Sequence, residues 1–144
     1  MKRLFALSLT AIAMLALAVP AVADTPTAKI NRKWLLVTTN GNKTIEAGKT
    51  FKHCTQNHVK RIDARGEVSG ATEGDKYKGV WRKDGTKIIT FNHSWKKSSG
   101  KVTFSTLSTT SDNLPDGKFK VTVKQDGEAL ASSAISLKTT GDCG

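Results

Sequence analysis

The sequence contains little of what catalysis and metal binding commonly use. Its two methionines, Met1 and Met14, both lie in the first 23 residues, so the rest of the chain offers no thioether ligand. It has no His-Glu-x-x-His, Gly-x-Ser-x-Gly or phosphate-loop pattern. Acidic residues are scarce, with 12 Asp and Glu against 23 Lys and Arg. These absences favour a non-catalytic protein without a cofactor, and the excess of positive charge favours anionic partners.

The first 23 residues have the pattern of a secretory signal peptide. Met1-Lys2-Arg3 is basic, an apolar run extends from Leu4 to Val19, and Ala21-Val22-Ala23 is an Ala-x-Ala cleavage site. A membrane anchor is the alternative, but the run is short for a span and no later stretch is apolar enough for one. We therefore expect a periplasmic or secreted protein with one domain, residues 24–144, whose formal charge falls from +11 to +9 on cleavage.

Two cysteines, Cys54 and Cys143, remain after this cleavage. An exported chain with an even number of cysteines is expected to pair them in an oxidising compartment. Thiols kept free for metal or redox work are the alternative, but the chain has no Cys-x-x-Cys pattern. We therefore predict a disulfide between Cys54 and Cys143, which would tie the C-terminus to an early strand.

The stretch Leu114–Lys138 predicts a β-hairpin. Phe119, Val121 and Val123 alternate with polar residues, mostly lysine, as in a strand with one apolar face. Asp126-Gly127 then reverses the chain. A two-residue loop would turn Ile135 and Leu137 to water, whereas a three-residue loop that includes Gln125 returns both to the apolar face. We therefore expect the three-residue loop.

A second hairpin is predicted for Lys76–Arg82 and Lys87–Trp95, again with a three-residue loop, Lys83-Asp84-Gly85. Residues 24–31 look like a loose lead, and several shorter alternating runs occupy 33–68 and 101–107. No helix is expected after residue 23. Many short strands separated by turn residues predict one antiparallel β-sandwich of seven to nine strands, with a small barrel as the alternative.

The pattern Leu-Pro-Asp-Gly-Lys-Phe-x-Val-x-Val-x-x-Asp-Gly, Leu114–Gly127, resembles the terminal hairpin of immunoglobulin-like and fibronectin-III-like modules of exported bacterial proteins. The resemblance covers about the last 30 residues and implies an immunoglobulin-like sandwich with an adhesion, adaptor or ligand-binding role. Cys54 and Cys143 lie too far apart in sequence for the antibody-type cysteine pair.

Four residues could bind a soft metal, and they support a metal carrier as an alternative function. They are His53, Cys54, His58 and His93. A disulfide would remove the thiolate, and the simpler interpretation is two exposed loop histidines and one histidine packed beside Trp95. A small envelope enzyme is a further alternative, which would need a pocket that joins a carboxylate to His93.

Basic residues are candidates for anion binding, with Trp95 as an aromatic contact. The set is Lys60, Arg61, Arg65, Lys96, Lys97 and Lys101. The expected partner is an acidic protein or an anionic glycan or lipid headgroup, and no aromatic signature points to nucleic acid. Lys118, Lys120 and Lys124 form a stripe that could bind anions or protect an edge strand from pairing; protection is the simpler explanation.

Overall fold

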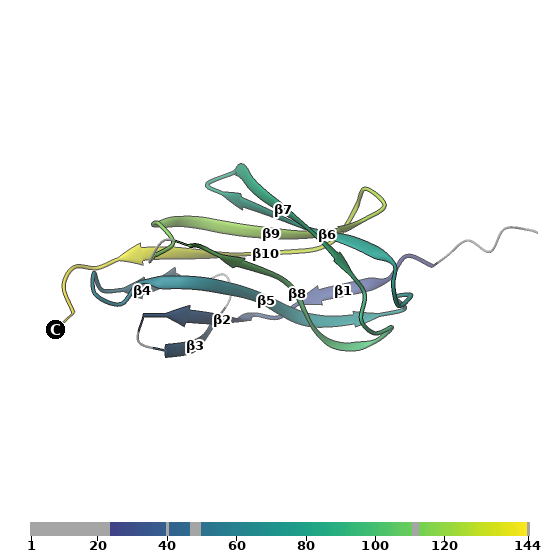
Figure 1. Cartoon of the computed structure of the whole chain (residues 1–144), viewed down its shortest axis with the longest axis horizontal. Coiled ribbons are helices and arrows are strands. Elements are labelled where there is room, and N and C mark those ends of the chain that lie inside the picture. Colours follow the sequence, from purple (N-terminus) through teal and green to yellow (C-terminus); the bar gives the residue numbers. More distant parts are fainter. Residues whose placement is uncertain (1–23, 40, 47–49, 111–112, 144) are drawn as a thin grey trace, which may run out of the picture.

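The protein folds into two facing β-sheets, seen in a computed structural model that describes residues 24–39, 41–46, 50–110 and 113–143 (Figure 1). The predicted signal peptide, residues 1–23, lies outside the described residues. No helix in the described part is long and apolar enough to span a membrane. The ten strands are β1 (Thr27–Ile30), β2 (Lys33–Thr38), β3 (Gly41–Glu46), β4 (Thr50–His53), β5 (Val59–Ser69), β6 (Lys76–Lys83), β7 (Thr86–Ser94), β8 (Gly100–Ser108), β9 (Gly117–Gln125) and β10 (Glu128–Thr139).

Each sheet has five strands. In the first sheet, the long strand β5 pairs with β1, β2 and β8, and β3 pairs with β2. The second sheet has the order β4-β10-β9-β6-β7, so β9 is its central strand and β4 and β7 are its edges. The predicted all-β sandwich is therefore confirmed, with two corrections: the ten strands exceed the predicted seven to nine, and β4 pairs with β10 in parallel, not antiparallel.

The additional strand arises in the N-terminal segment, which we expected to be a loose lead. Thr27–Ile30 pairs with the end of β5, where Ile30 lies opposite Gly66. Ala28 and Ile30 pack against the buried cluster between the sheets, so even four residues bury enough apolar surface to order this segment. Two apolar residues are too few for a period to be recognised in the sequence.

Both Asp-Gly hairpins have two-residue loops, which corrects the predicted three-residue loops. Gln125 pairs with Glu128 across Asp126-Gly127, and both loop residues have positive φ (50° and 83°), as a type I′ turn requires. The register then shifts by one residue between Ala129 and Ala131. This β-bulge returns the strand to the predicted face, so Phe119 lies opposite Ile135 and both are buried.

The β6–β7 hairpin uses the same arrangement. Lys83 pairs with Thr86 across Asp84-Gly85, and a register shift follows at Ile88. Trp81 consequently lies opposite Ile89, on the face predicted for both. The core between the sheets joins Trp81 to Trp34 of β2, with ring centroids 6.2 Å apart.

The predicted disulfide between Cys54 and Cys143 is present. It joins the segment after β4 to the segment after β10, two strands that pair in parallel. It therefore fixes a parallel edge pair, which has no tight turn of its own to hold it.

Candidate functional site

The outward-facing side of the second sheet is the candidate site, because its side chains are almost all neutral or positive. Along β9, Phe119, Val121 and Val123 are buried while the lysines between them point outward. The pairing of β9 with β6 and β10 extends this outward row across the sheet. We call the resulting basic set the cationic face: Lys52, Lys76, Lys78, Arg82, Lys87, Lys118, Lys120, Lys124 and Lys138.

Like charges lie directly opposite one another on the cationic face. Lys78 pairs with Lys124, and Arg82 pairs with Lys120 on one side and Lys87 on the other. Such pairs are destabilising in a sheet. In the described part of the chain, no Asp or Glu occupies an outward position on these five strands, and no side chain of the set forms an ion pair.

The outward side of the first sheet is different, because acids there lie among the bases. The Arg61 guanidinium contacts the Asp63 carboxylate at 3.0 Å. Glu67 lies opposite Lys29 on one neighbouring strand and Lys101 on the other. The excess positive charge of the protein is therefore concentrated on one sheet.

The anion-binding residues predicted from the sequence do not form one cluster. Lys60 and Arg61 lie near the start of β5, whereas Lys101 lies opposite Glu67, six residues or roughly 20 Å further along the strand. Lys96 and Lys97 are exposed in the loop after β7. Arg65 is exposed between the two groups on the outward side of the first sheet. The structure thus spreads the predicted set along a sheet that also carries acids.

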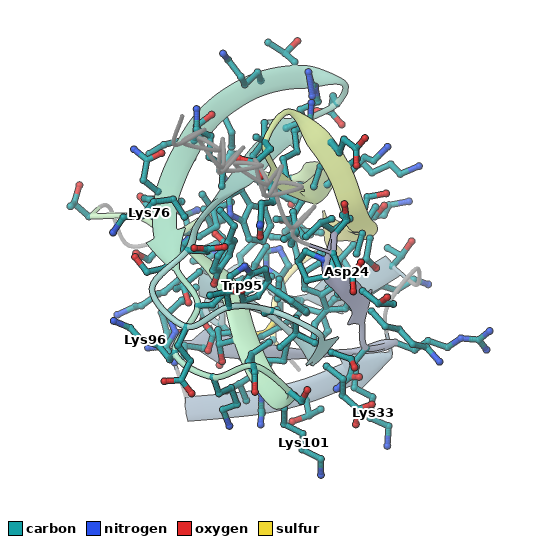
Figure 2. The ribbon with its side chains drawn as sticks, turned by 90° about the vertical axis from the view of Figure 1, so that its right-hand side faces the viewer. Asp24, Lys33, Lys76, Trp95, Lys96 and Lys101 are labelled. Atoms are coloured by element: carbon teal, nitrogen blue, oxygen red, sulfur yellow. A yellow bond between two sulfur atoms is a disulfide. The ribbon has the colours of Figure 1, made fainter. Side chains whose placement is uncertain are left out.

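Trp95 is buried, so it cannot be the predicted aromatic contact. It is 2 % exposed, stacks on Tyr77 at 4.0 Å, and donates a hydrogen bond from Nε1 to Gln125 Oε1 at 2.6 Å. Figure 2 shows Trp95 among the side chains between the sheets, with Lys76, Lys96 and Lys101 at the periphery. The flanking lysines suggested an exposed residue, but the tryptophan indole points into the core.

The lysine stripe does not protect an edge. Lys118, Lys120 and Lys124 belong to β9, which is hydrogen-bonded to β10 on one side and β6 on the other. A central strand has no open edge to protect, so the simpler explanation offered for the stripe is wrong.

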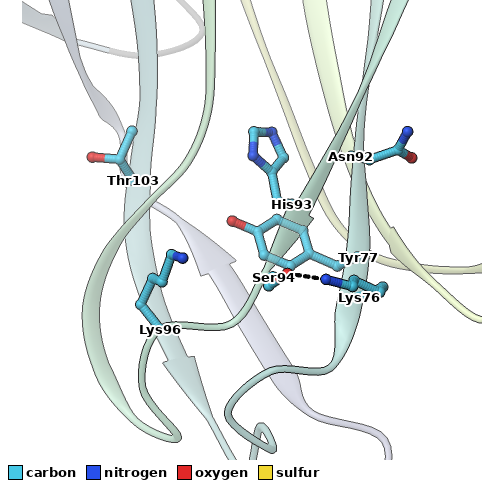
Figure 3. Close-up of a pocket in the computed structure, with 7 residues that line it drawn as sticks. All are labelled: Lys76, Tyr77, Asn92, His93, Ser94, Lys96 and Thr103. Atoms are coloured by element: carbon cyan, nitrogen blue, oxygen red, sulfur yellow. Dashed lines mark hydrogen bonds between the residues drawn. The ribbon is translucent and has the colours of Figure 1, made fainter.

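A hollow of about 440 Å³ lies beside the cationic face, next to β7 (Figure 3). It is lined by Lys76, Tyr77, Asn92, His93, Ser94, Lys96 and Thr103. The Lys76 ammonium donates a hydrogen bond to Ser94 Oγ at 2.8 Å, and Lys96 reaches the hollow from the following loop. The charged groups that line it are therefore lysines, and none of its lining residues is an acid.

Burial shifts the pKa values of the two titratable rings of this hollow. Burial raises the pKa of Tyr77 to about 12, and its hydroxyl donates to the Phe104 carbonyl at 3.0 Å. Burial also lowers the pKa of His93, whose Nε2 lies 3.3 Å from Ser105 Oγ. Trp81 Nε1 donates to the same hydroxyl at 2.9 Å. These contacts join the β6–β7 hairpin to β8 of the other sheet.

The histidines proposed as metal ligands are divided between opposite edges of the second sheet. His53 and His58 lie together, with ring centroids 5.6 Å apart, and His53 Nε2 is 3.4 Å from Asp116 Oδ1. His93 is on β7, four strand spacings or roughly 19 Å away from β4. In the described residues no group of three or more His, Cys, Asp or Glu is arranged to hold a metal ion, and Cys54 is in the disulfide.

The sequence signal for the cationic face was present but divided. Lys76, Lys78 and Arg82 share one parity on β6, and the stripe on β9 shows the same alternation. Only the pairing of Lys78 with Lys124, which are far apart in sequence, brings the two rows onto one surface. Lys138 was missed because it is an isolated lysine in its strand.

Comparisons with known proteins identify the fold. No protein-family model matches the chain, and no curated protein matches its sequence. Among solved structures, the chain is similar to an immunoglobulin-like protein from Pseudomonas aeruginosa, with a TM-score of 0.50 and 13% identity, over 81% of this chain and 99% of the other. At this identity the similarity shows an immunoglobulin-like fold and nothing about function.

Proposed function

We propose that this immunoglobulin-like domain is an exported, non-catalytic binding module that recognises an anionic partner through the cationic face. The single observation that carries the proposal is the position of the lysine stripe on the central strand β9. Two of its three lysines, Lys120 and Lys124, lie opposite bases of β6, which lowers the stability of the sheet, so neither edge protection nor folding accounts for them.

A partner with several negative charges fits this surface. The basic side chains extend over all five strands, and the carboxylate beside them in a second hollow, at one end of the face, is that of Asp126, in the β9–β10 turn. Release of counterions from a polyanion would add to the affinity and make it depend on salt. The export signal predicted from the sequence places the partner in the periplasm or outside the cell.

Retention on immobilised heparin tests the proposal, with a pair of variants that have the same net charge. Lys78→Gln with Lys124→Gln removes two charges from the cationic face. Lys29→Gln with Lys101→Gln removes two from the first sheet, where both flank Glu67. We expect the first variant to elute at lower salt, with the slope of log affinity against log salt reduced by about one per contacting lysine.

The control variant should elute close to the native protein. Equal losses in the two variants would mean that only net charge matters and would refute the assignment to this face. Absence of retention at low salt would refute an anionic partner altogether.

A further inference from the structure

The edge strand β7 has features that the cationic face does not explain. Nearly all of its residues are exposed or half-buried. In the described part of the chain, the large apolar side chains that are strongly exposed are Ile88 and Ile89, at 46% and 39%, and both are on this strand. Exposed apolar residues on an open edge mark either an aggregation hazard or a site where another strand pairs.

The features that protect an edge strand from pairing are confined to one end of β7. Lys87 and the β-bulge at Ile88 lie beside the turn. From Ile89 to Ser94 the strand has regular register with β6, and it contains no proline, lysine, arginine or acid. Alternate residues of this six-residue stretch therefore point their backbone N–H and C=O groups away from β6, where another strand can pair with them.

We propose that an extended, acidic segment of a partner protein adds to the second sheet along β7 as a sixth strand. The partner's acidity rests on the function proposed above, whereas the pairing itself depends only on the backbone of β7. Backbone hydrogen bonds would supply affinity, and alternate side chains would supply specificity.

The surroundings of β7 define what the added strand should carry on each face. Its outward side chains would continue the row of Lys76, Lys78 and Arg82, about 10 Å away across β7, so acidic residues suit these positions. Its inward side chains would meet Ile89, so apolar residues suit them. Near Ser94 an inward acidic residue could instead enter the hollow between Lys76 and Lys96.

A second copy of this chain fits the edge less well. Pairing two β7 strands would join two cationic faces into one continuous sheet and place the β6 bases of the two copies on the same surface, three strand spacings or roughly 14 Å apart. A protein of formal charge +9 after the predicted cleavage also repels its own copies. Charge complementarity therefore selects an acidic segment.

Amide hydrogen exchange with a synthetic probe tests this proposal on the full mature domain. The probe is a ten-residue peptide of alternating valine and glutamate, blocked at both ends. We expect it to slow the exchange of edge-facing amides between Ile89 and Ser94. A second peptide, methylated on the backbone nitrogens of one edge, keeps the charge but cannot pair, and should bind about tenfold more weakly or worse.

Two variants with the same net charge separate pairing from simple attraction. Ile89→Lys places a charge under the added strand and should weaken binding of the probe, even though it makes the domain more positive. Ser132→Lys adds the same charge at an exposed position opposite Thr122 and should maintain or strengthen binding. Tighter binding by both variants would mean that attraction alone operates, and would overturn the proposal.

The remaining outcomes are also decisive. Equal affinity for the methylated peptide, or protection that avoids β7, would overturn strand addition while leaving the cationic face intact. A failure of the proposed function would appear separately, as loss of retention on heparin. Sedimentation that shows a dimer of the free protein, abolished by Ile89→Lys, would assign the edge to a second copy and overturn the acidic segment.

Discussion

Replacing Gly79 by alanine should destabilise the domain strongly, because the added methyl has no room. A Cβ at Gly79 would lie 2.6 Å from Ser105 Cβ, closer than real Cβ atoms come to one another, and closer still to Ser105 Oγ. The backbone at Gly79 does not have positive φ, so alanine is not excluded by conformation. Without crowding, Gly→Ala would stabilise the fold by about 0.4–1 kcal/mol. The available space therefore decides the sign.

The expected loss has two parts. Overpacking a well-filled interior costs about 1–3 kcal/mol. Moving Ser105 also takes the hydroxyl away from the buried Trp81 Nε1, which now donates to it at 2.9 Å. A buried donor left without an acceptor costs about 1–3 kcal/mol. After allowance for the favourable chain-entropy effect, we expect the free energy of unfolding to fall by about 1–5.6 kcal/mol.

Urea unfolding followed by tryptophan fluorescence measures this loss, and a double-mutant cycle identifies its cause. Ser105→Gly removes the atoms that the new methyl would strike, so its combination with Gly79→Ala should be less damaging than the sum of the two single changes. A loss below about 1 kcal/mol for Gly79→Ala would show that β8 moves away freely from β6. Additive single effects would show that Ser105 is not the obstacle.

Three further predictions concern titration and the disulfide. Tyr77 is the only tyrosine, so absorbance at 295 nm should show its phenol titrating near pH 12. The free energy of unfolding should fall between about pH 10 and pH 12, because the phenol of the unfolded chain ionises first. A titration midpoint near pH 10 would contradict the burial of this ring. A hydrogen bond from the Thr139 backbone N–H lowers the pKa of Asp116, so the stability that this carboxylate adds should be lost as pH falls below about 4. Asp116→Asn should therefore make the free energy of unfolding depend less on pH in this acid range. An unchanged pH dependence would contradict the contribution of Asp116. Replacing Cys54 and Cys143 by serine should lower the free energy of unfolding by up to about 4–5 kcal/mol, measured in urea; a loss under about 1 kcal/mol would show that the closed loop adds little.

The residues on the apolar face of each hairpin strand could be predicted from the sequence, but the lengths of the loops between the strands could not. The rule that Ile135 and Leu137 share a face with Phe119 was correct. The loop length inferred from that rule was wrong, since a bulge at Leu130 produces the same parity as one more loop residue. Bulges leave no distinct mark in a run of small residues, so the two arrangements look alike in the sequence.

The candidate site was less predictable because it depends on strands that are distant in the chain. The bases of β6 and β9 were visible as two separate alternating runs. Whether a lysine stripe protects an edge or forms a binding face depends on which strands pair beside it. Here the chain leaves the second sheet after β7, forms β8 in the first sheet, and returns as β9 beside β6. Trp95 was misjudged for a related reason, because its hydrogen-bond partner, Gln125, lies 30 residues further along the chain.

The repulsion between facing bases such as Lys78 and Lys124 has a consequence for how occupancy could be detected. A free domain carries this unfavourable energy, and anything that neutralises it, whether salt or a bound polyanion, raises the melting temperature. Substitutions that replace these bases by neutral residues should make the isolated domain more heat-resistant as they weaken binding. Heat resistance and recognition are thus opposed on this surface, and a thermal shift by a partner that is lost when Lys78 and Lys124 are replaced by glutamine reports that the lysines are covered.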